Sequence, residues 1–271
     1  MKTFIVPHDF TDIADNALEH AIVTAKPLAA QIIVLHVVPK GEKLNDSEEK
    51  LDQIVARHAH HGVKLIPVVR KGSIFEEIAD MGEENHAELI IMGTHGAHGW
   101  QHITGSYALK VVTSSTVPFI IVQDSKIGEL GYKDIVVPLD LNKETKQKLA
   151  IVADLAKYFG SRVHVIVPDE TDEFLRHHTM ANIQFAKKFF AERDIELTAT
   201  VAPSSGFDKE VVKHAVAIGA DLIAIMNMSR GGVFGQIGSN YEQYVITNEA
   251  KIPTLIVNPI ESKYGQSILF S

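Results

Sequence analysis

One segment of the chain has the composition of an anion-binding loop. Gly93 and Gly96 follow an apolar run, and Gly105 and Ser106 precede a helical pattern. Glycines let a backbone turn sharply and approach a ligand without a Cβ in the way. The free N–H groups and the dipole of a helix N-terminus attract an anion. The segment therefore indicates a phosphate site, while a purely structural glycine turn is the alternative.

Polar residues also follow two other apolar runs. Asp9 comes two residues after Pro7, and the run from Gln31 to Val38 ends in His36-Val37-Val38. In open α/β sheets ligands bind beyond the carboxyl ends of the strands. If these runs are parallel strands, their ends and the glycine segment meet at one edge of the sheet.

Histidine is the one unusual residue type, with 14 copies. His95, His98 and His102 crowd the glycine segment, and His8 follows another apolar run. Converging imidazoles are typical zinc ligands, although scattered surface histidines are more common. The chain has no cysteine, which excludes disulfides, thiolate zinc sites and thiol nucleophiles.

The sequence offers no catalytic constellation. Asp9 and Asp140 are lone carboxylates after apolar runs, without an adjacent acid–base partner or nucleophile. Ser106 lies near His102 in sequence, but its position before a helix favours capping. We therefore predict a binding protein rather than an enzyme with dedicated turnover.

The elements that position these residues are repeated along the chain. Val6-Pro7-His8-Asp9 recurs as Val137-Pro138-Leu139-Asp140, and Gly105-Ser106 recurs as Gly238-Ser239. The offset between related segments is 131 residues near the start of the unit, 133 further on and 135 at Pro118–Val122 and Pro253–Val257. Such self-similarity indicates a tandem duplication.

Each copy alternates short apolar runs with helical patterns. Runs rich in Val and Ile are typical of parallel strands covered on both faces. The predicted strands are Thr3–Val6, Gln31–Val38, Val63–Val69, Glu88–Met92 and Pro118–Val122 in the first copy, and Asp134–Val137, Arg162–Val167, Glu196–Val201, Asp221–Met226 and Pro253–Val257 in the second. Five strands alternating with four helices predict a doubly wound α/β sheet in each copy.

Local signals mark several helix ends. Thr11 is expected to cap a helix that stops before Pro27. Ser73 and Glu76 form a capping-box pattern, and Gly160 is a suitable C-terminal residue for a helix of the second copy.

Length and composition agree with two soluble domains. The 271 residues suit two domains with normal cores, because 45% of the residues are hydrophobic. We assign domains to residues 1–123 and 134–258, a linker to 124–133 and a tail to 259–271. The last strands of the two domains are candidates for pairing with each other.

Charge and hydropathy limit the partners. The net charge of −8 disfavours nucleic acid and anionic membranes. No uncharged apolar run approaches the roughly 20 residues of a membrane helix. Pro7, His8 and Asp9 interrupt any signal-peptide pattern at the start, so we expect a cytoplasmic protein.

The combined motifs resemble the universal stress protein family. They are Pro-x-Asp after the first strand, His-Val in the second, and Met-Gly-Thr-His-Gly followed by Gly-Ser before the last helix. The resemblance extends over both copies. It implies a tandem of two Rossmann-like domains of the adenine nucleotide alpha hydrolase type, and ATP as ligand with or without Mg²⁺.

The resemblance also implies roles for residues of the first copy. By this resemblance Asp9 is expected near the ribose or a phosphate-bound metal, and Pro7 is expected to shape the strand exit. The remaining implied contacts are Val37 to the adenine, Met92 and Gly93 beside the nucleotide, and Gly96, Gly105 and Ser106 to the phosphates. One departure is that Ala97 to Thr104 supply eight residues where the ATP-binding pattern has nine.

The second copy departs further from the phosphate pattern. Met226 and Ser229 replace Gly93 and Gly96. We therefore expect a stress-response module that binds adenine nucleotide in its first domain. Alternatives are a nucleotide-independent scaffold of the same fold and a histidine-rich metal-binding variant. The expected partners also include a second tandem chain in a homodimer and a protein of unknown identity.

Overall fold

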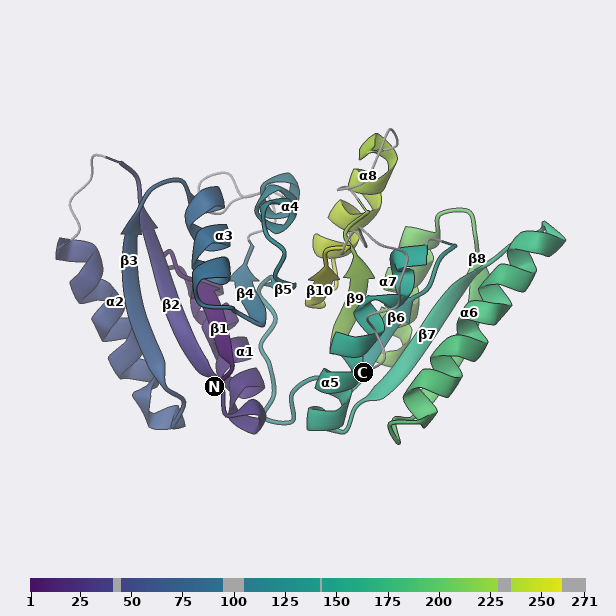
Figure 1. Cartoon of the computed structure of the whole chain (residues 1–271), viewed down its shortest axis with the longest axis horizontal. Coiled ribbons are helices and arrows are strands. Elements are labelled where there is room, and N and C mark those ends of the chain that lie inside the picture. The colour runs from purple at the N-terminus through teal and green to yellow at the C-terminus, as the bar shows by residue number, and fades with distance from the viewer. Residues whose placement is uncertain (41–44, 95–104, 142, 229–234, 260–271) are drawn as a thin grey trace.

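Ten strands form a single sheet in the computed structural model, which describes the chain apart from residues 41–44, 95–104, 142, 229–234 and 260–271 (Figure 1). The strand order is β3-β2-β1-β4-β5-β10-β9-β6-β7-β8. The strands of the first half are β1 (Thr3–Pro7), β2 (Gln31–Val38), β3 (Leu65–Lys71), β4 (Leu89–Gly93) and β5 (Phe119–Val122). Those of the second half are β6 (Asp134–Pro138), β7 (Arg162–Asp169), β8 (Leu197–Pro203), β9 (Leu222–Met226) and β10 (Thr254–Val257).

Every predicted strand is present, and its ends are displaced by at most two residues. Within each half all strand pairs are parallel. The five residues of β1 and the five of β6 are buried throughout, as expected for strands covered on both faces. The α/β prediction is therefore confirmed.

The two halves are joined at their last strands. β5 and β10 pair antiparallel, with Ile120 opposite Leu255. The prediction that these strands pair is confirmed, because each would otherwise present unpaired backbone groups at an edge. Their pairing has a further consequence: the two parallel sheets are not separate but merge into one mixed sheet.

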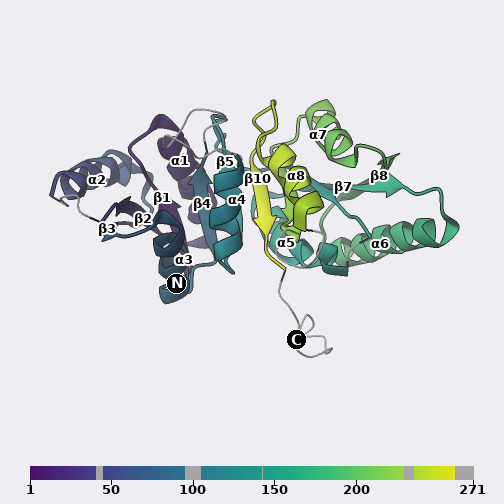
Figure 2. The ribbon, with the colours of Figure 1, turned by 90° about the horizontal axis from the view of Figure 1, so that it is seen from above.

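Helices cover both faces of this sheet (Figures 1 and 2). One face carries α1 (Asp12–Leu28), α2 (Asn45–His58), α5 (Lys148–Phe159) and α6 (Glu173–Ala191), whose apolar residues join one core cluster. The other face carries α3 (Ile74–Glu84), α4 (Gly105–Ser114), α7 (Phe207–Ile218) and α8 (Gly235–Ile246), which share a second cluster. Two short 3₁₀ helices, η1 (Ala59–His61) and η2 (Lys143–Lys146), complete the described elements.

Two buried amides connect the halves on the face that carries α4 and α8, which pack side by side there (Figure 2). Asn258, just after β10, donates hydrogen bonds to the carbonyl oxygens of Val112 (2.8 Å) and Ser115 (2.7 Å) at the end of α4. Gln123, just after β5, donates to the carbonyl oxygen of Asn248 (3.1 Å) beyond the end of α8. Each half thus satisfies carbonyl groups at the end of the other half's last helix.

Helix ends follow the sequence signals in part. The Thr11 hydroxyl caps α1 by accepting from the Ala14 N–H (3.3 Å), and Gly160 ends α5 in a left-handed conformation, as predicted. The prediction that α1 stops before Pro27 is wrong. Pro27 lies in the last turn, where its missing N–H costs one bond only, and the left-handed residue Ala29 closes the helix. Ser73 precedes α3, but its side chain makes no capping bond.

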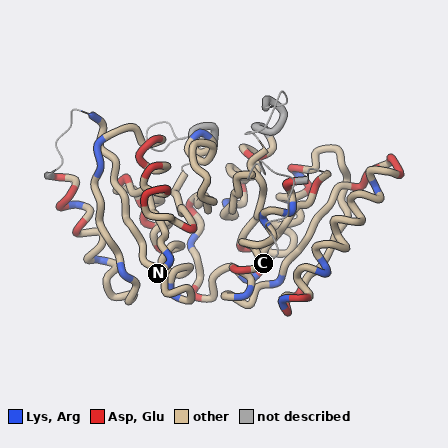
Figure 3. The backbone as a smooth tube through the Cα atoms, viewed as in Figure 1, with Lys and Arg blue, Asp and Glu red and all other residues tan. Residues whose placement is uncertain are grey.

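Charged residues of both signs are spread over both halves, and acidic residues are frequent along α3 (Figure 3). None of the helices in the described ranges is long and apolar enough to cross a membrane.

Candidate functional site

The predicted site lies where β1 and β4 end and α1 begins. Pro7 is the buried last residue of β1, and Asp9 follows it in the connection to α1. The Asp9 carboxylate accepts hydrogen bonds from the Thr11 N–H (3.2 Å) and the Thr11 hydroxyl (2.5 Å). One oxygen of Asp9 therefore organises the turn into α1.

Two predicted contacts lie inside the core. Val37 in β2 and Met92 in β4 are 6% and 2% exposed, and both belong to the cluster beneath α3 and α4. The structure thus brings Val37 and Met92 into one cluster, while little of either side chain reaches the surface.

Gly93 has a packing role that the sequence did not reveal. A Cβ at Gly93 would lie 2.8 Å from the Ile13 carbonyl oxygen and 2.9 Å from Ile13 Cγ2. The end of β4 therefore approaches the first turn of α1 more closely than any side chain permits. In the second half Met226 occupies the matching position, and the chain there forms η2 instead of a regular helical turn.

The glycine segment is only partly described. Gly96 and the histidines His95, His98 and His102 lie outside the described residues. Gly105 and Ser106 are the first two residues of α4, so the predicted helix start is displaced by one residue. In the second half α8 begins at Gly235, so the matching pair Gly238 and Ser239 lies inside the helix.

A buried histidine organises the connection between β1 and α1. His8 is fully buried, and its Nδ1 accepts a hydrogen bond from the Phe10 N–H (3.1 Å). Nε2 therefore carries the proton and donates to Asp15 Oδ1 (3.1 Å). Burial lowers the pKa of His8, and the nearby carboxylate of Asp15 opposes that shift only in part. His8 is thus held neutral in one tautomer.

Further contacts fix the same connection. His36 Nδ1 donates to the His8 carbonyl oxygen (2.7 Å), and the Phe10 ring lies 4.3 Å from the His36 ring. Phe10 itself has a φ of 67°, a conformation that is costly for a bulky residue. Arg57 bonds Asp15 from α2 (3.2 Å). Sequence reasoning missed this network; its only signal was a histidine between Pro7 and Asp9.

An open cavity of about 560 Å³ borders the turn. It is lined by Phe10, Thr11, Asp12, Ile13, Asn16 and Asp124. The aspartates make this lining acidic, although Asp124 also forms an ion pair with Lys251. An anion placed here would require a compensating cation.

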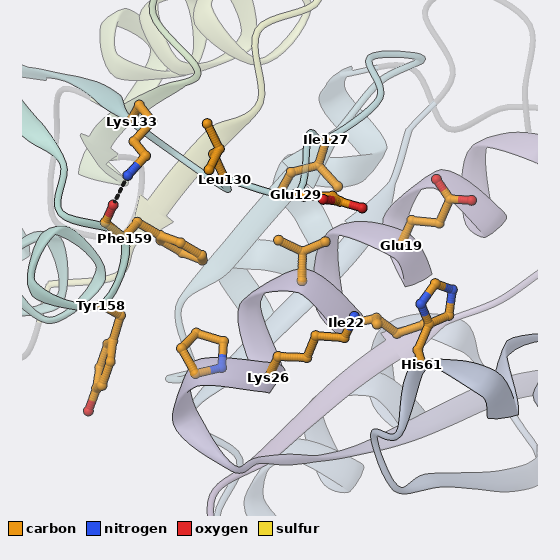
Figure 4. Close-up of a pocket in the computed structure, with 12 residues that line it drawn as sticks. Glu19, Ile22, Lys26, His61, Ile127, Glu129, Leu130, Lys133, Tyr158 and Phe159 are labelled. Atoms are coloured by element: carbon orange, nitrogen blue, oxygen red, sulfur yellow. Dashed lines mark hydrogen bonds between the residues drawn. The ribbon is translucent and has the colours of Figure 1, made fainter.

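A second cavity, of about 690 Å³, lies between the halves and away from the carboxyl ends of the strands (Figure 4). Its walls are α1, the 127–133 segment and the end of α5, and Lys133 donates to the Phe159 carbonyl oxygen there. None of the predicted site residues lines it.

Comparison with known proteins relates the first half to one family. Residues 1–123 match the model of the universal stress protein family. A universal stress protein of Methanocaldococcus jannaschii is 27% identical over 46% of this chain and 84% of its own. Universal stress protein G of Salmonella typhimurium is 26% identical over 45% of this chain and 99% of its own.

The fold of the whole chain also has a known counterpart. A universal stress protein structure from Archaeoglobus fulgidus superposes with a TM-score of 0.74 at 16% identity, covering 96% of this chain and 97% of that one. This likeness extends the fold over both halves. Residues 1–123 are therefore similar to the universal stress protein family, and the residues behind them form a second unit of the same fold.

Proposed function

We propose that the first half binds an adenine nucleotide, ATP, and that binding regulates a stress response. The observation that carries the proposal is that α4 begins at Gly105 and Ser106, after the segment that leaves the carboxyl end of β4. A helix N-terminus at this edge offers N–H groups to phosphate. The family match over residues 1–123 supports the same assignment.

The proposed contacts follow the family resemblance. They are Pro7, Asp9, Val37, Met92, Gly93, Gly96, Gly105 and Ser106. Burial of Val37 and Met92 limits their part to the apolar wall that an adenine ring would meet. The turn that carries Asp9 is already rigid, because His8, Phe10 and Asp15 hold it.

A nucleotide bound here would bring its own divalent cation. The oxygens of Asp12, Asn16 and Asp124 line the cavity beside the turn, and Mg²⁺ prefers oxygen ligands. No group of three or more possible metal ligands gathers among the residues that the structure describes. We therefore assign Mg²⁺, when present, to the phosphates, with these side chains as additional oxygen donors.

We propose that the second half binds nucleotide weakly or not at all. Met226 fills the position of Gly93, and α8 starts three residues before the matching Gly238–Ser239 pair. Ser229, in the position of Gly96, adds a side chain to the same segment. In this half a side chain stands where a ligand would need close approach to the backbone. The helix N-terminus also lies away from the glycine–serine pair.

The test compares Gly96→Val with Gly238→Val by calorimetric titration of ATP and Mg²⁺. We expect the first variant to lose binding and the second to retain it nearly unchanged. Mass spectrometry of small molecules released from the purified protein should detect an adenine nucleotide. An unmodified protein that binds no ATP in the titration would contradict the proposal.

The acidic cavity lining and the eight-residue spacing favour one alternative, a nucleotide-independent interaction module. In that case millimolar ATP with Mg²⁺ leaves the melting temperature unchanged. A shift produced by zinc alone would instead indicate a metal-binding variant that uses His95, His98 and His102.

The proposed organisation has domains 1–123 and 134–258, the linker 124–133 and the tail 259–271. We also propose a cytoplasmic location and a homodimer of tandem chains. Light scattering at micromolar concentration should give twice the chain mass, and a mass equal to one chain would contradict the dimer.

A further inference from the structure

Two ionisable side chains are buried in the second half at positions where the first half is apolar. Lys148, which is 2% exposed, matches Ala17 at the repeat offset of 131. Glu242, which is fully buried, matches Leu109 at the offset of 133. Buried charges are costly unless they are bonded, so both replacements need a physical reason.

Glu242 reaches the chain segment that leaves the sheet after β9. Its Oε1 accepts a hydrogen bond from the Met228 N–H (2.8 Å). Its Oε2 is buried and makes no hydrogen bond with the described part of the chain. Met228 stands two residues after β9, where His95 stands two residues after β4 in the first half. A carboxyl group therefore bonds a backbone N–H of the segment that matches the proposed phosphate-binding one.

The charged groups around Glu242 come from several elements. Asp140 after β6 acts on it electrostatically, and Lys148 on α5 is influenced by the same carboxylate. Tyr241, its neighbour on α8, is half-buried, and Asp208 on α7 acts on that phenol. Burial raises the pKa of Glu242, and Asp140 adds to the rise. Burial lowers the pKa of Lys148 to about 8.

We propose that Glu242 is a specificity-determining residue that closes the second half to phosphate. Its carboxyl is an internal ligand of the segment after β9, because it takes a backbone N–H that a phosphate oxygen would otherwise accept from. Leu109, the matching residue of the first half, has no acceptor atom and cannot take the place of a phosphate oxygen in this way. This inference rests on the asymmetric binding proposed above and assigns it to one side chain.

Electrostatics act in the same direction. A phosphoryl group that enters this site must displace the carboxyl from the Met228 N–H. It then lies among Glu242 and Asp140, and like charges in a low-dielectric site repel strongly. Lys148 alone does not offset this repulsion, because it supplies one positive charge, on which the Asp140 carboxylate already acts. The second half is thus expected to discriminate against phosphates even where its backbone could fold around them.

The first measurement is amide hydrogen exchange at Met228. Glu242→Leu, which installs the first-half residue, should raise the exchange rate about tenfold or more, since the hydrogen bond from the Met228 N–H to the Glu242 carboxyl is lost. The Val245 amide on the same helix reports any general loosening. Glu242→Gln keeps an acceptor oxygen and should restore protection. Unchanged protection of Met228 in Glu242→Leu would overturn the internal-ligand role.

The second measurement tests phosphate rejection in a Gly96→Val background, which silences the first half. Tripolyphosphate binding, followed by phosphorus NMR, should be absent in Gly96→Val and detectable in Gly96→Val combined with Glu242→Leu. Absence of binding in the double variant would overturn the specificity role. Failure of the unmodified protein to bind ATP would contradict the proposed function but leave both of these measurements meaningful.

Discussion

The two halves of the chain have the same strand order and differ in the groups that lie where the strands end. In the first half His8 is buried after β1, and Leu139 takes its place after β6. On the helices it is the second half that carries the buried polar groups, because Glu242 and Lys148 stand where the first half has apolar residues. The same topology therefore carries a neutral imidazole network in one half and buried ionisable groups in the other.

What the halves share is the contact that joins them. Gln123 and Asn258 occupy matching positions after the last strands, and each bonds carbonyl groups of the other half. The hydrogen bonds of these amides involve none of the residues proposed to bind a ligand at the strand ends. The comparison indicates that the two regions have separate roles. The central interface joins the halves, and the residues at the strand ends determine the chemistry of each half.

The largest expected effect tests whether the halves unfold together. Leu18 on α1 and Leu149 on α5 are matching residues with almost no exposure. Changing either to Ala should cost about 3 kcal/mol, the usual loss for a buried leucine. Because the halves share one sheet, we expect one unfolding transition in urea for both variants. Two separate transitions would show that each half is stable alone.

Acid should weaken the first half through His20. Its Nε2 donates to the Ser125 carbonyl oxygen (3.1 Å), so Nδ1 accepts from the Tyr132 hydroxyl (2.9 Å). Burial lowers the pKa of His20 to about 4, whereas the unfolded chain keeps a pKa near 6.5. The unfolded state therefore binds the proton first, and stability falls between pH 6.5 and 4.

The expected loss is up to about 3 kcal/mol, since one pKa unit corresponds to about 1.4 kcal/mol. Urea unfolding at several pH values should show a smaller loss in His20→Gln, which cannot titrate. Equal pH profiles in both proteins would mean that the linker bonds do not depend on this imidazole. The matching residue, Ile151, gives the second half no such term.

The cross-domain amides should have unequal effects. Asn258→Ala leaves the carbonyl oxygens of Val112 and Ser115 without this donor, whereas Gln123→Ala affects only that of Asn248. We expect a loss of about 2 kcal/mol for the first variant and about 1 kcal/mol for the second. Thermal unfolding measures both. A larger loss for Gln123→Ala would reverse the assignment.

The smallest effect concerns Lys148. In the unfolded chain its pKa is 10.5, and burial lowers it to about 8 in the folded protein. The folded state releases the proton first, so stability rises between pH 8 and 10.5. Lys148→Met should flatten this rise and gain about 1 kcal/mol at pH 7, because removing the buried ammonium outweighs the loss of its hydrogen bond to the Thr145 hydroxyl (3.1 Å). Absence of a gain would mean that Asp140 compensates the ammonium fully.

The fold was accessible to sequence reasoning because its signals are local and repeated. Apolar runs, the Thr11 cap and the Gly160 terminus each depend on a few neighbouring residues. The antiparallel pair of β5 and β10 was also anticipated, since an unpaired last strand needs a partner. The misplaced end of α1 at Pro27 shows the limit, because one missing bond in a final turn is tolerated.

By itself, the sequence determined the α/β class, the duplication and the edge of the sheet where Asp9 and Gly93 meet α1. Only the tertiary structure decided that Gly93 is required for contact with Ile13, that His8 is a neutral donor to Asp15, and that Glu242 bonds Met228. Periodicity and turn chemistry are properties of adjacent residues. Burial, tautomer and hydrogen-bond partner depend on atoms brought together from distant parts of the chain, which no local pattern specifies.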